Sequence, residues 1–183
     1  MNKLFDISPM KGWTEIQLFD KYGNAKLLFQ GNILWKFLKS LFNVDLVLPL
    51  ITGVYTTKSV RYNTVTSVGK KIAADQTGGT TAAPATAIAI GIGTPSATAL
   101  GSESTTNGGS RGAATVTNTT TTTTGDTEQW AKTFTFTGTL VLTEEGIFDN
   151  NTSGGNMLAS QTFSAINVVN TDTLTITHKV KFA

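Results

Sequence analysis

The chain has 183 residues, enough for one domain with a sizeable core. Hydrophobic residues make up 39% and charged residues 14%, whereas an average soluble domain is roughly 25% charged. Cysteine is absent, which excludes disulfides and thiolate-bound metals. The net charge is +2 and the sequence has no cluster of basic residues, so we expect no nucleic-acid partner.

Neither a leader nor a membrane span is predicted. Residues 1–6 lack the apolar run of about 7–15 residues that a signal peptide needs. The longest apolar stretch, residues 46–51, is far shorter than a membrane-spanning helix. We therefore expect a soluble chain made in the cytoplasm, with no membrane partner.

The first predicted elements form a β-hairpin. Residues 13–19 alternate large apolar with polar side chains, which is the period of a strand. Residues 20–24 (DKYGN) supply turn chemistry, and residues 25–29 can return as a second strand.

A short amphipathic helix is predicted next, over residues 32–43. Asn32 is a good N-cap, and apolar pairs recur after it at steps of three and four, with Lys36 and Lys39 on the other side. A helix on a membrane surface usually carries more basic residues on its polar face. We therefore favour a helix laid over the end of a β core.

The amino-acid composition changes in the middle of the chain. Residues 54–68 are rich in β-branched and aromatic residues and are predicted as strand. Residues 72–126 form a low-complexity Ala/Thr/Gly/Ser segment. Residues 87–93 within it can be a strand. The segment as a whole can serve as an extended arm. The threonine run at 119–124 fits an edge strand or a loop, and less well a glycosylated stalk.

Clear alternation returns in the C-terminal part, residues 128–183. Strands are predicted at 130–137, 140–142, 157–163 and 174–182, with an interruption at 144–146 and a turn-rich loop at 149–155. Strands at this spacing predict a single, mainly β domain over 1–183, with a β-sandwich or jelly-roll-like barrel, one short N-terminal helix and extended loops.

No catalytic, cofactor or metal site is predicted. The single histidine, His178, shares a strand face with Leu174 and Ile176, so we interpret it as a packing residue. Glu144 and Glu145 are adjacent on an extended chain and should point to opposite faces, which makes them poorly placed for paired-carboxylate chemistry.

Two loops have residues typical of ligand sites. Residues 149–153 (DNNTS) offer oxygen ligands to a hard cation, but a solvated turn is the preferred interpretation. Residues 91–95 (GIGTP) fail as a phosphate-binding glycine loop, because Ser96 stands at the third glycine position and Pro95 lacks an amide hydrogen.

Several short motifs resemble a family of tailed-phage structural proteins. An "IGxGT" segment stands at 90–94, "TALGxE" follows at 98–103, and Arg111 comes after a glycine-rich turn. Residues 144–163 (EEGIFDNNTSGGNMLASQTF) resemble the family's "GIFD … GGxML" segment, and the DKYGN turn and closing strand are similar too. The spacer between Gly93 and Thr98 is shorter than the family pattern, and the threonine run is foreign to it.

The resemblance implies a virion component without catalytic activity. Its best-fitting role is a head decoration or cement protein, which binds the major capsid protein as a homo-oligomer, with a trimer favoured. The alternative is a tail, adaptor or fibre component, in which a hexamer or dodecamer is expected. Either protein would be made in the bacterial host's cytoplasm and end in the virion.

A more distant alternative is a carbohydrate-binding or hydrolysing β-sandwich. It would use Trp13, Trp35 or Trp130 as a stacking platform and Glu144 or Glu145 as the acid. Core packing is preferred for each tryptophan, because all three lie in apolar periodic segments.

Overall fold

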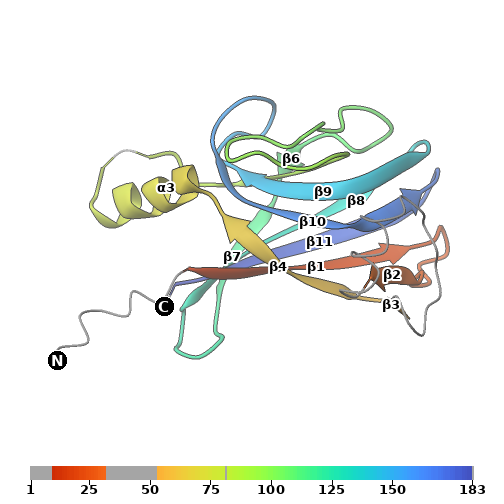
Figure 1. The fold of residues 1–183 in the computed structure, drawn as a ribbon, viewed down its shortest axis with the longest axis horizontal. Helices are drawn as coiled ribbons and strands as arrows, with labels where there is room; N and C mark the ends of the chain where they lie inside the picture. The colour runs from red at the N-terminus through yellow and green to blue at the C-terminus, as the bar shows by residue number, and fades with distance from the viewer. Residues whose placement is uncertain (1–9, 32–52, 81, 183) are drawn as a thin grey trace, which may run out of the picture.

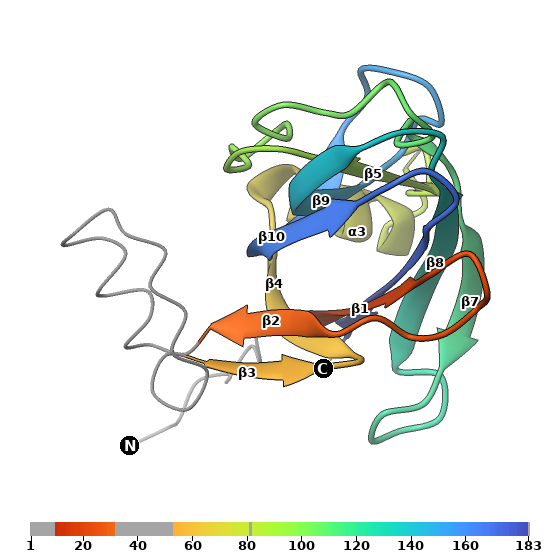
Figure 2. The ribbon, with the colours of Figure 1, turned by 90° about the vertical axis from the view of Figure 1, so that its right-hand side faces the viewer.

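In the residues that the computed structural model describes, 10–31, 53–80 and 82–182, an antiparallel nine-stranded sheet curls into a nearly closed barrel (Figures 1 and 2). Its strands follow each other around the sheet in the order β6-β5-β9-β10-β4-β1-β11-β8-β7, and β2 and β3 form a separate pair. The bounds are β1 Lys11–Phe19, β2 Leu28–Gly31, β3 Gly53–Thr56, β4 Ser59–Val65, β5 Ala87–Gly91, β6 Gly112–Ala113, β7 Thr115–Thr119, β8 Thr127–Thr135, β9 Leu140–Phe148, β10 Met157–Val168 and β11 Thr173–Lys181.

One stretch of chain brings the two ends of the sheet together. β6 pairs with β5, and β7, which begins only two residues after β6 ends, pairs with β8. The amide of Ala114, the residue between them, donates to the Thr86 carbonyl at 2.8 Å. The mainly β, barrel-like class predicted from the strand spacing is therefore confirmed.

The barrel interior is built by the alternation seen in the sequence. Every second residue of β1 and of β11 is buried, and β8 adds two aromatic rings. The side chains at the centre are less than 5% exposed: Ile16, Leu18, Trp130, Phe134, Leu174, Ile176 and Val180. The predicted strands at 13–19, 130–137 and 174–182 thus correspond to β1, β8 and β11.

The strand predicted over 54–68 is wrong at its end, because the helix α3 (Ser67–Thr77) begins there. The chain before it forms the strands β3 and β4, and β4 ends at Val65. The next residue, Thr66, caps α3, because its Oγ1 accepts a hydrogen bond from the Gly69 amide at 2.8 Å. The helix has little amphipathic pattern because only Gly69 and Ile72 are buried in it. A Cβ on Gly69 would lie 2.0 Å from the Leu158 carbonyl oxygen, so the glycine permits the close approach of α3 to β10.

The predicted helix over 32–43 lies outside the described residues. Within the described part of the chain, no helix is long and apolar enough to cross a membrane.

The segment 72–126, for which an extended arm was predicted, contributes instead to the body of the barrel. It supplies the end of α3 and the strands β5, β6 and β7. β5 lies between β6 and β9, and Ala87, Ile88, Ala89 and Ile90 are each 0% exposed. Small alanines on one face and isoleucines on the other let both faces of this strand pack closely.

The threonine run is part edge strand and part ordered loop. Thr119 ends β7, and the following residues turn back into β8 around the carboxylate of Asp126. That carboxylate accepts the amides of Thr121, Thr122 and Thr123 at 2.8–3.0 Å and the Thr127 hydroxyl at 2.8 Å. The hydrogen bond from Thr123, with those from Thr121, Thr127 and Thr122, holds the pKa of Asp126 well below its ordinary value.

We expect Asp126→Asn to destabilise the protein at neutral pH and to lose this effect in acid. A lowered carboxyl pKa in the folded state means that the stabilisation is fully present above the unfolded value of about 3.9 and is lost progressively as the pH falls from there toward the lower pKa of the folded state. Urea unfolding of both proteins between neutral pH and about pH 3 measures the difference. Asp75→Asn on α3 is the charge-matched control, and a difference that stays constant down to pH 3 would contradict the assignment.

Candidate functional site

The barrel interior holds a cluster of buried polar side chains. His178 on β11 and Glu145 on β9 are both 0% exposed, and Nδ1 of the imidazole lies 2.9 Å from Oε1 of the carboxyl group. Thr14 on β1 donates its hydroxyl to the same Oε1 at 2.8 Å and lies 3.1 Å from Nδ1. β9 and β11 are not neighbours in the sheet, so this contact joins two walls of the barrel across its interior.

Asn63 on β4 completes the cluster. Its Nδ2 contacts Nε2 of His178 and donates to the Lys179 carbonyl at 3.2 Å. Gly12 makes room for it, because a Cβ there would lie 2.0 Å from the Asn63 amide. Oε2 of Glu145 and Oδ1 of Asn63 are buried and have no hydrogen-bond partner among the residues that the structure describes.

This interior cluster links β1, β4, β9 and β11 through the contacts of His178 with Thr14, Asn63 and Glu145. The imidazole is sealed from solvent, so a substrate does not reach it in this structure. The sequence placed His178 on the inner face with Leu174 and Ile176, and the three are 0% exposed together. The polar neighbours could not be found from the sequence, because they come from three other strands.

The adjacent carboxylates of Glu144 and Glu145 have separate partners. The predicted interruption of the strand at 144–146 is wrong, since β9 continues through these residues. Glu144 accepts hydrogen bonds from the amides of Gly101 and Ser102, both at 2.9 Å, while Glu145 faces His178. The two adjacent glutamates, which in the sequence suggest the end of a strand, are therefore accommodated in a buried strand, because each carboxyl group has its own hydrogen-bond partners.

Glu144 anchors the loop between β5 and β6. The loop is also tied to β9 by the Thr143 hydroxyl, which accepts from the Gly93 amide at 2.7 Å and donates to the Gly93 carbonyl at 3.2 Å. The GIGTP segment, rejected as a phosphate loop, thus has its Gly93 amide hydrogen-bonded to Thr143.

We expect Glu144→Ala to loosen this loop. Two amides lose their acceptor, which should lower the free energy of unfolding by about 1–3 kcal/mol and speed amide exchange over residues 92–102. Denaturant unfolding together with hydrogen exchange measures both effects. Glu128→Ala on β8 is the control, and equal exchange in the two variants would rule out the anchor.

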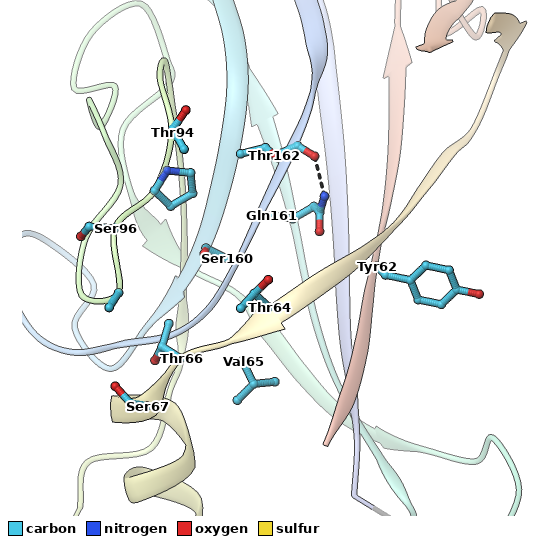
Figure 3. Close-up of a pocket in the computed structure, with 12 residues that line it drawn as sticks. Tyr62, Thr64, Val65, Thr66, Ser67, Thr94, Ser96, Ser160, Gln161 and Thr162 are labelled. Atoms are coloured by element: carbon cyan, nitrogen blue, oxygen red, sulfur yellow. Dashed lines mark hydrogen bonds between the residues drawn. The ribbon is translucent and has the colours of Figure 1, made fainter. Parts of the chain in front are cut away.

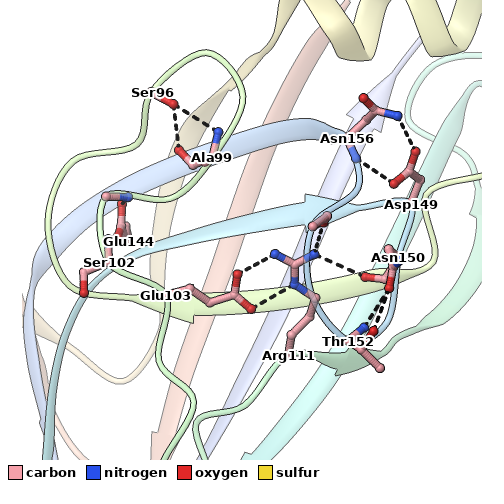
Figure 4. Close-up of polar contacts among 12 residues, drawn as sticks. Ser96, Ala99, Ser102, Glu103, Arg111, Glu144, Asp149, Asn150, Thr152 and Asn156 are labelled. Atoms are coloured by element: carbon pink, nitrogen blue, oxygen red, sulfur yellow. Dashed lines mark hydrogen bonds and ion pairs between the residues drawn. The ribbon is translucent and has the colours of Figure 1, made fainter.

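A second buried charge, Arg111, contacts four residues, and Figure 4 shows its polar contacts with Glu103 and with the loop that contains Asn150. Its side chain is 3% exposed, and its guanidinium forms a two-pronged ion pair with Glu103, with Nε at 2.9 Å from Oε1. The guanidinium carbon lies 3.6 Å from the ring centre of Phe148, and Nη1 donates to the carbonyls of Gly154 at 2.7 Å and Asn150 at 3.4 Å. We call Glu103, Arg111, Phe148 and the 149–156 loop the Arg111 brace.

The loop considered as a cation site uses its oxygens internally. The Asp149 carboxylate accepts both the backbone amide and the side-chain amide of Asn156 at 2.7 Å (Figure 4). Oδ1 of Asn150 accepts from the amide and hydroxyl of Thr152 at 2.9 and 3.0 Å. Among the described residues, no three His, Cys, Asp or Glu side chains gather as a metal-binding group.

An open groove of about 590 Å³ lies on the outside of the barrel, between the loop at Thr94–Ala97 and the strands β4 and β10 (Figure 3). Its lining contains no charged side chain. Hydroxyl and amide groups dominate the lining, which consists of Tyr62, Thr64, Val65, Thr66, Ser67, Thr94, Pro95, Ser96, Ala97, Ser160, Gln161 and Thr162.

With this geometry established, the chain was compared with known proteins. No family model, curated protein or solved structure matches it.

Within the described part of the chain, the tryptophans and carboxylates expected for a sugar-hydrolysing site do not come together. Trp130 is 4% exposed and donates its indole N–H to the Ala85 carbonyl at 2.7 Å, so it is a core residue. Trp13 lies on the outer face of β1 opposite Tyr62 on β4, and Trp35 lies outside the described residues. Glu144 and Glu145 are both 0% exposed.

Proposed function

We propose that this chain is a non-enzymatic structural protein of a tailed-phage virion, with the role of a capsid decoration protein. The observation that carries the proposal is the Arg111 brace. Glu103, Arg111 and the "GIFD … GG" segment are the residues that resemble virion proteins, and they meet in this brace. Their contacts hold two loops onto the β5–β9 face, which is a structural role.

The motif glycine at position 91 supports the same interpretation. A Cβ there would lie 2.4 Å from the Ser102 carbonyl oxygen, and Gly91 forms a bridge to Glu103. The "IG" and "GxE" segments therefore pack backbone against backbone, and a side chain at Gly91 would separate them. The motifs thus favour a stable body, as a shell component needs.

The weakly charged surface fits burial against neighbouring subunits. Four of the five residues of β7, Thr115–Asn118, are exposed and uncharged. Permanent interfaces are poor in charged residues at their centres. A decoration protein of this kind would bind the major capsid protein and other copies of itself, with a trimer favoured.

A tail, adaptor or fibre component is the second candidate, because the same motifs and surface suit it. Tail rings have closed symmetries, so this role predicts about six or twelve copies in each particle. The role of a decoration protein predicts hundreds of copies in each particle.

Quantitative mass spectrometry of purified virions tests the proposal. A copy number approaching that of the major capsid protein supports decoration, whereas a few copies per particle support a tail or portal position. Absence from the particle would refute the virion role. Binding of the purified chain to capsids that lack it provides an independent check of decoration.

A further inference from the structure

We propose that the open groove between β4, β10 and the Thr94–Ala97 loop binds a neutral oligosaccharide. The groove volume of about 590 Å³ lies within the range of about 300–1,000 Å³ typical of small-molecule sites. This inference does not depend on a position in the virion, and it concerns none of the carboxylates considered for sugar hydrolysis.

The floor of the groove is lined by hydroxyl groups. Ser160 is only 6% exposed and lines the groove centrally (Figure 3). The hydroxyls of Thr64 and Thr162, two exposed residues, lie beside it in the lining. Each of these hydroxyls can both donate to and accept from the polar groups of a ligand in the groove.

The chemistry of the lining selects the class of ligand. Hydroxyl groups both donate and accept, and Gln161 adds an amide; together they match the alternating donors and acceptors of a sugar. The ring of Tyr62 is 87% exposed at the rim and offers an apolar face to a sugar's C–H surface. In Figure 3 this ring projects away from the Thr94–Ala97 loop, so it suits a sugar unit that extends beyond the groove.

Anionic ligands and peptides fit less well. No Lys or Arg lines the groove, and the first turn of α3 is occupied by the Thr66 cap on the Gly69 amide. A peptide that adds as a strand needs unpaired backbone groups, but β4 and β10 already pair through Thr64 and Ser160 at the floor.

The walls are preorganised, which reduces the entropy lost on binding. The loop wall is fixed to β9 by Glu144 and Thr143. Within it, the Ser96 hydroxyl accepts the Ala99 amide at 3.0 Å and holds the turn. On the opposite wall, the pairing of β10 with β9 is irregular between Thr162 and Ile166, and such bulges often occur next to binding sites.

The test is a glycan array of neutral and acidic oligosaccharides, probed with the labelled full-length chain beside an array of uncharged peptides. Titration calorimetry then follows the best neutral glycan. We expect at least one neutral glycan to bind, Thr94→Arg to abolish binding by filling the groove, and Ser160→Ala to weaken it about tenfold.

Thr117→Arg on β7 is the control, because it adds the same exposed charge away from the groove. It should bind as the unaltered chain does, and circular dichroism should show all variants folded. The proposal would be overturned if no neutral glycan bound, if only acidic glycans bound, or if peptides bound in place of glycans. So would binding that survives Thr94→Arg.

Discussion

Arg111→Ala is expected to lower the free energy of unfolding by about 2–4 kcal/mol, a large part of the roughly 5–15 kcal/mol that stabilises a domain. The side chain is 3% exposed and its loss removes an ion pair, two hydrogen bonds to carbonyls and the contact with Phe148. Glu103 is left without its counter-ion, although its side chain is 23% exposed and water can partly replace the guanidinium. For a chain of this length the thermal midpoint should fall by several degrees.

Arg111→Lys should recover little of this stability. A lysine ammonium cannot present two parallel donors to Glu103 while also reaching the Gly154 carbonyl, and it does not stack on Phe148 as a planar guanidinium does. Hydrogen exchange in the 149–156 loop should rise in both variants, because Arg111 ties this loop to the barrel.

Lys70→Ala on the exposed side of α3 is the matched control for removal of a cation and should change stability by less than about 0.5 kcal/mol. Thermal and urea unfolding measure all three variants. A lysine variant as stable as the unaltered chain would show that the charge alone matters and would contradict the bracing role.

The strands could be predicted from the sequence wherever one face is buried and the other exposed. Such alternation indicates the strands β1 and β11, in which every second residue is buried. β5 shows the limit of this reasoning, because all five of its residues are buried and its alanines and glycine resemble a flexible segment. Its place in the sheet depends on its pairing with β9, a strand about fifty residues away.

Two further features follow from contacts distant in the sequence. α3 has no strong amphipathic pattern, and its start is fixed by the Thr66 cap and the approach of Gly69 to β10. The groove combines side chains from β4, β10 and the Thr94–Ala97 loop, so no local motif indicates it. Arg111 and Glu103 were singled out as motif residues, but only the structure reveals that they bind each other.

Glu145→Ala is expected to lower the free energy of unfolding by about 3–5 kcal/mol, because one partner of a fully buried polar pair is removed and a cavity remains. His178 and Thr14 both lose their carboxylate partner in the barrel interior, where neither can reach water. Glu145→Gln keeps an oxygen at the same distance and should be milder. His178→Ala should be similarly destabilising, since it leaves a cavity and leaves the buried carboxyl group of Glu145 with the Thr14 hydroxyl in place of two partners.

A double-mutant cycle separates this contact from the effect of cavity formation. If the two side chains stabilise each other across the barrel, Glu145→Ala combined with His178→Ala should destabilise less than the sum of the single variants, with a coupling of about 0.5–3 kcal/mol. Glu15→Ala is the control on the outer face, where the ion pairs with Lys58 and Lys179 should contribute no more than about 1 kcal/mol. Strict additivity in urea unfolding would mean that the polar cluster merely fills space, and the link between β9 and β11 would then have to come from the apolar core alone.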